Sequence, residues 1–150
     1  MTKRKDFMGA ALEEARQAAA RGEVPIGAVV VRGAEIVARA GNRTRELNDP
    51  TAHAEIIAIR HACRGAGLER LPDADIYVTL EPCAMCAAAI SFARLRRLYF
   101  GAEDEKGGAV IHGGRFYSSP TCHHAPEIYP GLGETDAAAL LVDFFRERRG

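Results

Sequence analysis

Two short motifs, far apart in the chain, constrain this fold more than any other feature of the sequence. The first is His53-Ala54-Glu55, and the second is Pro82-Cys83-Ala84-Met85-Cys86. One imidazole and two thiolates bind Zn²⁺ well and leave a fourth tetrahedral position open for water, and a carboxylate beside the histidine can move protons to and from that water. The fold must therefore bring the two motifs together, and the pattern predicts a catalytic zinc site.

The alternative is a structural zinc site, which needs a fourth protein ligand. Cys63 is the nearest spare thiol, but on a helix spanning residues 52–64 it lies roughly 15 Å along the axis from His53 and on another face. Four residues of a distant loop could still close the site: His112, Cys122, His123 and His124. We favour the catalytic site because H-x-E combined with P-C-x-x-C is the known signature of zinc deaminases, and both halves are present.

Helix geometry supports this chemistry. Pro82 suits the first position of a helix, which places Cys83 and Cys86 on one face of its first turn. There the positive end of the helix dipole favours thiolate, the form that binds metal. His53 and Glu55 would point roughly 200° apart on a regular helix. We therefore expect them at a helix N-terminus, directed into the site from its first turn.

The composition predicts one cytoplasmic domain over residues 1–150. The chain is 47% hydrophobic, which suffices for one core. We expect no signal peptide and no membrane segment, and the four cysteines fit a reducing compartment. The 20 basic and 20 acidic residues cancel, so any RNA contact must be a local patch and not a strong basic field.

Apolar periodicity predicts helices that alternate with strands. The expected helices span about 7–21, 52–64, 83–94 and 134–148, and Gly22 ends the first of them. The expected strands span 26–31, 36–40, 76–80 and 98–101. We expect a glycine-containing loop over 102–126 near the mouth of the site. The alternation favours an α/β fold with a sheet covered on both faces and the site at the strand ends where the two motif helices begin.

The sequence resembles the cytidine deaminase superfamily and, within it, the bacterial tRNA adenosine deaminases. The segments that carry the resemblance are Glu23-Val-Pro-Ile-Gly-Ala-Val, Gly41-Asn-Arg, Asp49-Pro-Thr-Ala-His-Ala-Glu-Ile, Tyr77-Val-Thr-Leu-Glu-Pro-Cys-Ala-Met-Cys-Ala, Phe100-Gly-Ala and Asp143-Phe-Phe-Arg. The resemblance implies a three-layer α/β/α fold with a central five-stranded mixed sheet. It also implies a homodimer that converts adenosine to inosine at the wobble position of an arginine tRNA, bound by its anticodon stem-loop. One Zn²⁺ per subunit and no organic cofactor are expected.

The resemblance also assigns roles to individual residues. His53, Cys83 and Cys86 would hold zinc, which lowers the pKa of a bound water. Glu55 would accept a proton from that water, pass it to adenine N1 and later protonate the departing ammonia. Asn42 matches the position that holds the target base, although a turn residue is the alternative. The other expected substrate contacts are Ala54, Asp104, Lys106, Phe144, Phe145 and Arg148.

Some of these assignments have structural alternatives. Asp104 and Lys106 could be ordinary surface charges. Phe144 and Phe145 could belong to the core, and Arg148 could complement the dipole of the last helix. His123-His124 departs from the Asn-His pair of some relatives.

Two other functions remain open at this point. A deaminase of free bases or nucleosides, acting on guanine, cytosine or cytidine, would use the same zinc residues, and zero net charge suits it. A non-catalytic binding module with structural zinc is also conceivable, but it would give Glu55 no task.

Overall fold

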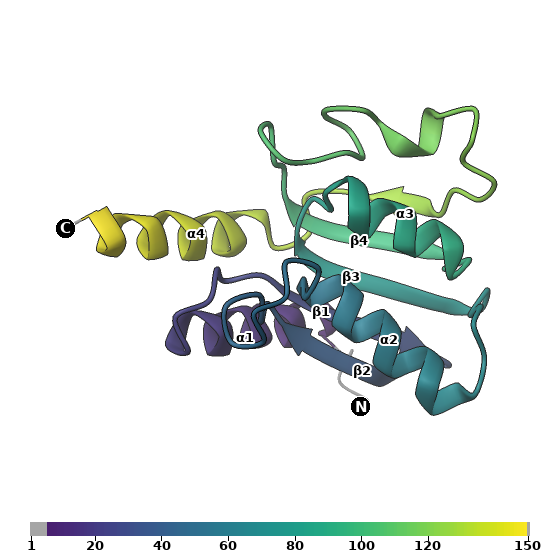
Figure 1. Cartoon of the computed structure of the whole chain (residues 1–150), viewed down its shortest axis with the longest axis horizontal. Coiled ribbons are helices and arrows are strands. Elements are labelled where there is room, and N and C mark those ends of the chain that lie inside the picture. The colour runs from purple at the N-terminus through teal and green to yellow at the C-terminus, as the bar shows by residue number, and fades with distance from the viewer. Residues whose placement is uncertain (1–5, 150) are drawn as a thin grey trace, which may run out of the picture.

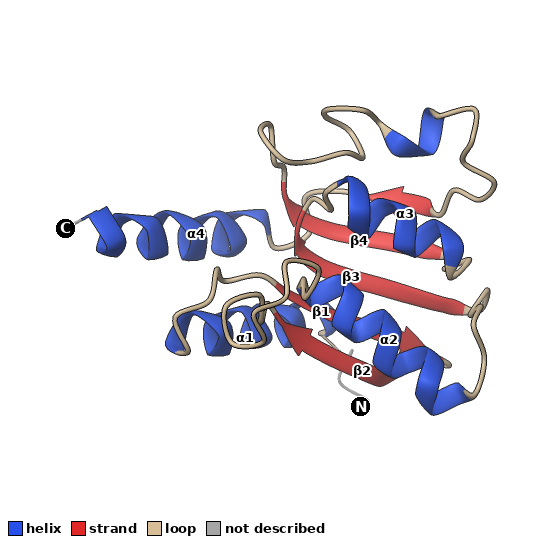
Figure 2. Ribbon diagram, viewed as in Figure 1, coloured by secondary structure: helices blue, strands red, loops and turns tan. Residues whose placement is uncertain are grey.

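The computed structural model describes residues 6–149, in which helices and strands alternate along the chain. Figures 1 and 2 show the arrangement of these elements. In chain order they are α1 (Phe7–Ala20), β1 (Gly27–Arg32), β2 (Glu35–Gly41), α2 (Ala54–Ala66), β3 (Ala74–Leu80), α3 (Ala84–Phe92), β4 (Arg97–Ala102), the short 3₁₀ helix η1 (Phe116–Ser118), β5 (Glu127–Tyr129) and α4 (Glu134–Arg149).

The strands form one five-stranded mixed sheet in the order β2-β1-β3-β4-β5. β1 is antiparallel to both β2 and β3, whereas β3, β4 and β5 run parallel. Since β2 and β3 flank β1 and both oppose it, the carboxyl ends of β2, β3 and β4 meet at one edge of the sheet. Open α/β sheets bind ligands at this edge.

Helices cover both faces of the sheet, which confirms the three-layer α/β/α prediction. α2 and α3 lie in front of the sheet in Figure 1 and pack on it through apolar residues such as Ile57 and Ile90. α1 packs on the opposite face together with α4, around Met8, Leu12 and Ala137. α1 approaches β1 closely because Gly27 has no side chain: a Cβ there would lie 1.9 Å from the Ala11 carbonyl oxygen.

Two local predictions differ from the structure. Pro82 does not occupy the first helical position, because Cys83 is the N-cap and α3 begins at Ala84. The periodicity did not locate β5, which has only three residues and therefore too few alternations to reveal a strand. The helix expected over 52–64 occurs as α2, two residues further along the chain.

None of the helices within residues 6–149 combines the length and apolarity that a membrane span would need.

Candidate metal and catalytic site

The three predicted metal ligands meet at the carboxyl edge of the sheet. His53 Nδ1 lies 3.6 Å from Cys83 Sγ and 3.5 Å from Cys86 Sγ. The three donor atoms all lie within 4.8 Å of one another, the one such cluster found among residues 6–149. Zn–S bonds of about 2.3 Å and a Zn–N bond of about 2.0–2.1 Å at a tetrahedral angle imply an N···S separation of about 3.6 Å. The donor set therefore fits zinc in both chemistry and spacing.

Two helix N-termini place these donors. His53 is the N-cap of α2 and Cys83 is the N-cap of α3, both with extended backbone. Neither side chain caps its own helix, so both remain available to a ligand. Cys86 lies in the first turn of α3, and Glu55 lies in the first turn of α2, as predicted. We call His53, Glu55, Cys83 and Cys86 the metal corner.

The protonation states of the metal corner favour metal binding. Hydrogen bonds from Cys86 and then from His53 lower the pKa of Cys83 to about 4. The shared hydrogen bond, together with burial, raises the pKa of Cys86, and the hydrogen bond to Cys83 raises that of His53. Cys83 is thus a thiolate near neutral pH, and a bound cation would displace the proton from Cys86.

Glu55 is buried beside the sulfur atoms, with only 4% of its surface exposed. Burial raises its pKa above the ordinary value, and the negative charge on Cys83 acts in the same direction. A carboxyl group whose pKa is displaced toward neutrality can both accept and donate a proton during one reaction. Glu55 is therefore a candidate general acid and base.

The structure supplies no fourth protein ligand from the residues that it describes. Cys63 lies near the far end of α2, where its Sγ contacts the Glu69 carbonyl oxygen. Cys122 and His124 join the end of the long loop to the C-terminal end of α3 through Ser91 and Leu95. The other two candidates are also elsewhere: His112 pairs with Glu81, and His123 is exposed. Such an open position is typical of catalytic zinc.

Asn42 follows β2 at the same edge and is 5% exposed. Within the described chain, its Oδ1 is the buried side-chain oxygen that lacks a hydrogen-bond partner. Buried acceptors normally have partners, so this oxygen could accept a hydrogen bond from a bound molecule. Its main chain is fixed, because the N–H donates to Ile26 and the carbonyl oxygen accepts from Arg21. Ala54, between His53 and Glu55, is fully buried.

Asp104 and Lys106 lie in the loop after β4. The Asp104 Oδ1 atom accepts hydrogen bonds from the main-chain N–H groups of Lys106 and Gly107 at 3.1 and 2.9 Å. Asp104 therefore shapes the turn, and the Lys106 side chain is exposed on it. We call residues 103–112 the anchored loop, because its main chain donates hydrogen bonds to the buried carboxylate of Glu81, two residues before Cys83.

The C-terminal candidates occupy α4, which projects from the sheet in Figure 1. Phe144 is buried at 6% exposure, and the Arg148 guanidinium lies 4.0 Å above its ring. Phe145 is 45% exposed. Phe145 and Arg148 are therefore exposed to solvent, whereas the ring of Phe144 is buried and packs against the Arg148 guanidinium.

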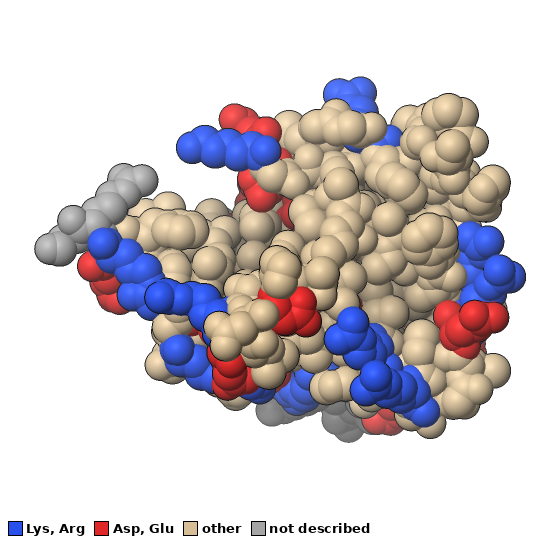
Figure 3. Space-filling view, in the orientation of Figure 1, with Lys and Arg blue, Asp and Glu red and all other residues tan. Residues whose placement is uncertain are grey.

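Positive charge does not dominate the face shown in Figure 3. Lys and Arg side chains gather over α2 and beside α4, with acidic side chains interspersed. This distribution agrees with the zero net charge and with local contacts to a polyanion.

The sequence reasoning missed two buried glutamates. Glu81, between β3 and Cys83, accepts main-chain hydrogen bonds from the anchored loop. Glu23 accepts hydrogen bonds from the main chain of Arg45 and Glu46, in the loop after Asn42. Each is 1% exposed. Both stand in segments that carry the family resemblance, but a carboxylate that binds distant main-chain groups leaves no local pattern in a sequence.

Comparisons with known proteins agree with this geometry. Residues 1–102 match the family model of the cytidine and deoxycytidylate deaminase zinc-binding region. The tRNA-specific adenosine deaminase of Agrobacterium fabrum is 66% identical over 149 residues, which cover 99% of this chain and 98% of that protein. That of Rickettsia bellii is 49% identical over 144 residues, covering 95% and 99%. A structure from a study of A-to-I editing by tRNA deaminases at the wobble position has a TM-score of 0.89 and 67% identity, covering 90% of this chain and 98% of that one.

Proposed function

The chain belongs to the tRNA-specific adenosine deaminases, within the family that carries the cytidine and deoxycytidylate deaminase zinc-binding region, and on this premise we propose that it converts adenosine to inosine at the wobble position of a tRNA. The reaction consumes water and releases ammonia. We further propose that residues 1–150 form one catalytic domain, that the substrate is an arginine tRNA bound by its anticodon stem-loop, and that the enzyme acts in the cytoplasm. The four cysteines, all free, support a reducing compartment.

One observation carries the proposal: a buried carboxylate lies beside a His-Cys-Cys donor set that has an open fourth position. We assign one zinc per chain to His53, Cys83 and Cys86, where it would supply a water of lowered pKa. A structural zinc would need a fourth ligand and would give Glu55 no role.

Glu55 is assigned the proton transfers. Its carboxylate would accept a proton from the attacking water and deliver it to adenine N1 as the oxygen bonds to C6. It would then take the proton of the new C6 hydroxyl and give it to the amino group, so that C6=O forms as the C6–N bond breaks and ammonia leaves. Burial that raises its pKa makes the protonated form accessible during the cycle. One side chain thus carries protons from the attacking water to N1 and to the amino group of the base.

Asn42 is assigned to the target base. Its unpartnered Oδ1 can accept a hydrogen bond from the base or its ribose, which restores the satisfaction normal for a buried amide. Ala54, which is fully buried between His53 and Glu55 in the chain, would line the pocket. A buried acceptor that bonds a substrate N–H or O–H group discriminates against substrate analogues that lack this donor, because the acceptor is then left unpaired.

RNA contacts outside the pocket are assigned to two surfaces. The anchored loop contributes Asp104 and Lys106, and α4 contributes Phe145 and Arg148 over Phe144. A single-stranded anticodon loop can splay its base into the pocket and stack other bases on exposed aromatic or guanidinium groups.

A homodimer is part of this proposal. We propose that the region from Ala87 to Arg94 contributes to the contact, although all but one of its apolar side chains are buried or only partly exposed. Phe92 is the exception, with 69% of its surface exposed at the end of α3. An exposed aromatic side chain is typical of an interface centre. Sedimentation that finds only monomer at micromolar concentration would contradict the dimer.

The test uses an anticodon stem-loop of an arginine tRNA with adenosine at the wobble position. Inosine should form in the stem-loop, whereas free adenosine should react poorly because it lacks the contacts outside the pocket. Parallel assays of ammonia release from guanine, cytosine and cytidine test the alternative. Rapid release from these compounds with no inosine in the stem-loop would replace the tRNA reaction by free-base or nucleoside deamination.

A further inference from the structure

The buried carboxylate of Glu81 accepts hydrogen bonds from four main-chain N–H groups. Its Oε2 accepts from the N–H groups of Val110, Ile111 and His112 at 3.1, 3.0 and 3.0 Å. Its Oε1 accepts from the Asp104 N–H at 3.0 Å and lies 2.8 Å from His112 Nδ1. With the side chain 1% exposed, these five groups replace the water that a carboxylate would otherwise bind.

The chain position of Glu81 connects two parts of the site. It follows β3 directly and its own N–H donates to the Ala102 carbonyl oxygen at the end of β4. Pro82 comes next, and the Pro82 carbonyl oxygen accepts a hydrogen bond from Ala109 of the anchored loop. Cys83 then begins the metal-binding helix. One segment therefore holds the anchored loop on one side and a metal ligand on the other.

The anchored loop packs closely against the Glu81 carboxylate. A Cβ added to Gly108 would lie 2.5 Å from Glu81 Oε2 and 2.5 Å from the Asp104 carbonyl oxygen. Ala109 and Val110 are buried, and Val110 joins the main core. Asp104 and Lys106 are thus carried on a turn whose two ends are both bound to Glu81.

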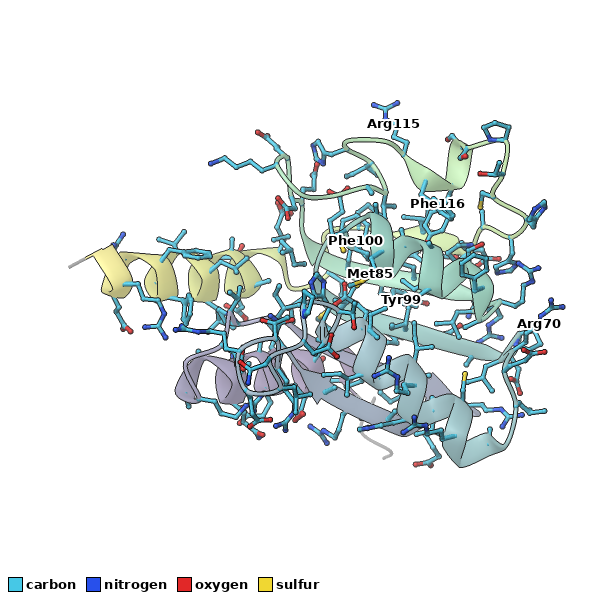
Figure 4. The ribbon with its side chains drawn as sticks, in the orientation of Figure 1. Arg70, Met85, Tyr99, Phe100, Arg115 and Phe116 are labelled. Atoms are coloured by element: carbon cyan, nitrogen blue, oxygen red, sulfur yellow. The ribbon has the colours of Figure 1, made fainter. Side chains whose placement is uncertain are left out.

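The more distal part of the same long loop is held differently. Phe116 and Tyr117 pack against the core, and the Tyr117 hydroxyl donates to the Ala87 carbonyl oxygen at 2.9 Å. Figure 4 shows Phe116 pointing toward α3, whereas Arg115 points away from the molecule. Apolar packing fastens this part, so the Glu81 carboxylate matters chiefly for residues 104–112.

We propose that Glu81 is a positioning residue that holds Asp104 and Lys106 of the anchored loop in place for the RNA. The inference rests on the proposed function. Because the carboxylate bonds main-chain groups and touches no donor atom of the metal site, its loss should affect RNA binding more than the chemical step. A displacement of a positioning group by about 1 Å can cost up to about 100-fold in efficiency.

The main test is Glu81→Gln, which keeps the shape of the side chain but replaces one accepting oxygen by a donor. We expect KM for the stem-loop to rise about tenfold, while kcat stays within about threefold and zinc content is unchanged. Amide exchange of Val110, Ile111 and His112, followed by NMR, should accelerate. The matched control is Glu105→Gln, which removes an exposed carboxylate of the same loop and should alter none of these quantities.

A second pair of variants perturbs the contact between the loop and Glu81 by changing a loop residue instead of the glutamate. Gly108→Ala inserts a methyl group against Glu81, whereas Gly114→Ala adds one where nothing lies within 4 Å. Gly108→Ala should raise KM in the same way as Glu81→Gln, and Gly114→Ala should not. This pair still tests the inference if Glu81→Gln does not fold.

The outcomes are separable. Wild-type KM in both Glu81→Gln and Gly108→Ala, or unchanged amide exchange in both, would overturn the positioning role. A joint fall of kcat and zinc content with unchanged KM would show instead that Glu81 supports only the metal-binding helix. Failure of the proposed function would appear in the wild-type enzyme, as absence of inosine, and the amide exchange would still decide whether Glu81 orders the loop.

Discussion

The metal corner and the anchored loop lie against each other but are built by different means. The metal corner stands on the first turns of α2 and α3, whose positions follow from regular hydrogen bonding and from a core that includes Ile57 and Ile90. The anchored loop has no regular element, and one carboxylate satisfies three main-chain N–H groups of its second half. The groups proposed for chemistry thus lie on rigid elements, whereas Asp104 and Lys106, proposed for RNA contact, lie on a loop held chiefly by one side chain.

The largest effect should come from removing a thiolate of the metal corner. Cys83→Ser and Cys86→Ser should lose zinc, all measurable turnover and part of the stability that a bound ion confers, because an alcohol is a poor ligand at neutral pH. Elemental analysis and melting curves measure both changes. Cys63→Ser, at the far end of α2, should keep zinc and activity. Full zinc occupancy in both cysteine variants would refute the ligand assignment.

Glu55→Gln should separate proton transfer from metal binding. The amide cannot carry the proton, so kcat should fall about 10²- to 10⁴-fold, while zinc content stays at the wild-type level. Single-turnover assays on the stem-loop, combined with metal analysis of the same sample, provide the measurement. A rate near that of the wild type would remove Glu55 from the mechanism.

Asn42→Ala should reduce substrate recognition without destabilising the protein. Loss of one buried hydrogen bond to the ligand, about 1–3 kcal/mol, corresponds to about a 5- to 150-fold fall in kcat/KM. The melting temperature should barely change, because Oδ1 has no partner within the described chain. A large fall in melting temperature with unchanged kcat/KM would make Asn42 a structural residue.

Lys106→Ala should weaken RNA binding by a few-fold and leave kcat unchanged. One phosphate contact fewer should also reduce the slope of binding against salt concentration by about one. The control is Arg70→Ala, an exposed cation at the edge of the molecule in the segment between α2 and β3 (Figure 4). Equal losses in the two variants would argue that only overall charge matters.

The smallest effect concerns His112 and depends on pH. Its hydrogen bond to Glu81 raises the pKa of His112 above the ordinary 6.5 or so, and Glu103 and Glu105 add to this. A raised pKa in the folded state stabilises the protein fully below the unfolded value and no longer does so once pH exceeds the folded value. His112→Gln should therefore lower the melting temperature by a few degrees at pH 6 and by less at pH 9. A pH-independent difference would contradict the ion pair.

The sequence predicted that the residues of the metal corner come together, because its signals are local. Three ligand types at fixed spacing indicate one ion, and the two-residue separation of His53 and Glu55 indicated a helix N-terminus. The structure places both residues there. Pro82 was predicted at the first helical position but lies two residues before it, because its fixed φ suits the position before an N-cap as well as the first turn.

The anchoring carboxylates could not be predicted in the same way. Glu81 and Glu23 bond main-chain groups that are more than twenty residues away in the chain. The short strand β5 likewise pairs with a distant segment, β4. Main-chain N–H groups are alike in every residue except proline, so their partners cannot be identified from residue type. The exposure of Phe92 and the burial of Phe144 likewise depend on how α3 and α4 meet the sheet.

By itself, then, the sequence determined the candidate residues for holding a metal and moving protons, the alternation that produces a layered α/β fold, and a resemblance to a family of tRNA enzymes. Only the tertiary structure decided that no fourth ligand joins the donor set within residues 6–149, that the buried Asn42 oxygen has no hydrogen-bond partner in the described chain, and that Glu81 binds the main chain of the anchored loop. The physical reason is range: periodicity and capping act over a few residues, whereas burial and the pairing of main-chain groups are set by which segments the folded chain brings into contact.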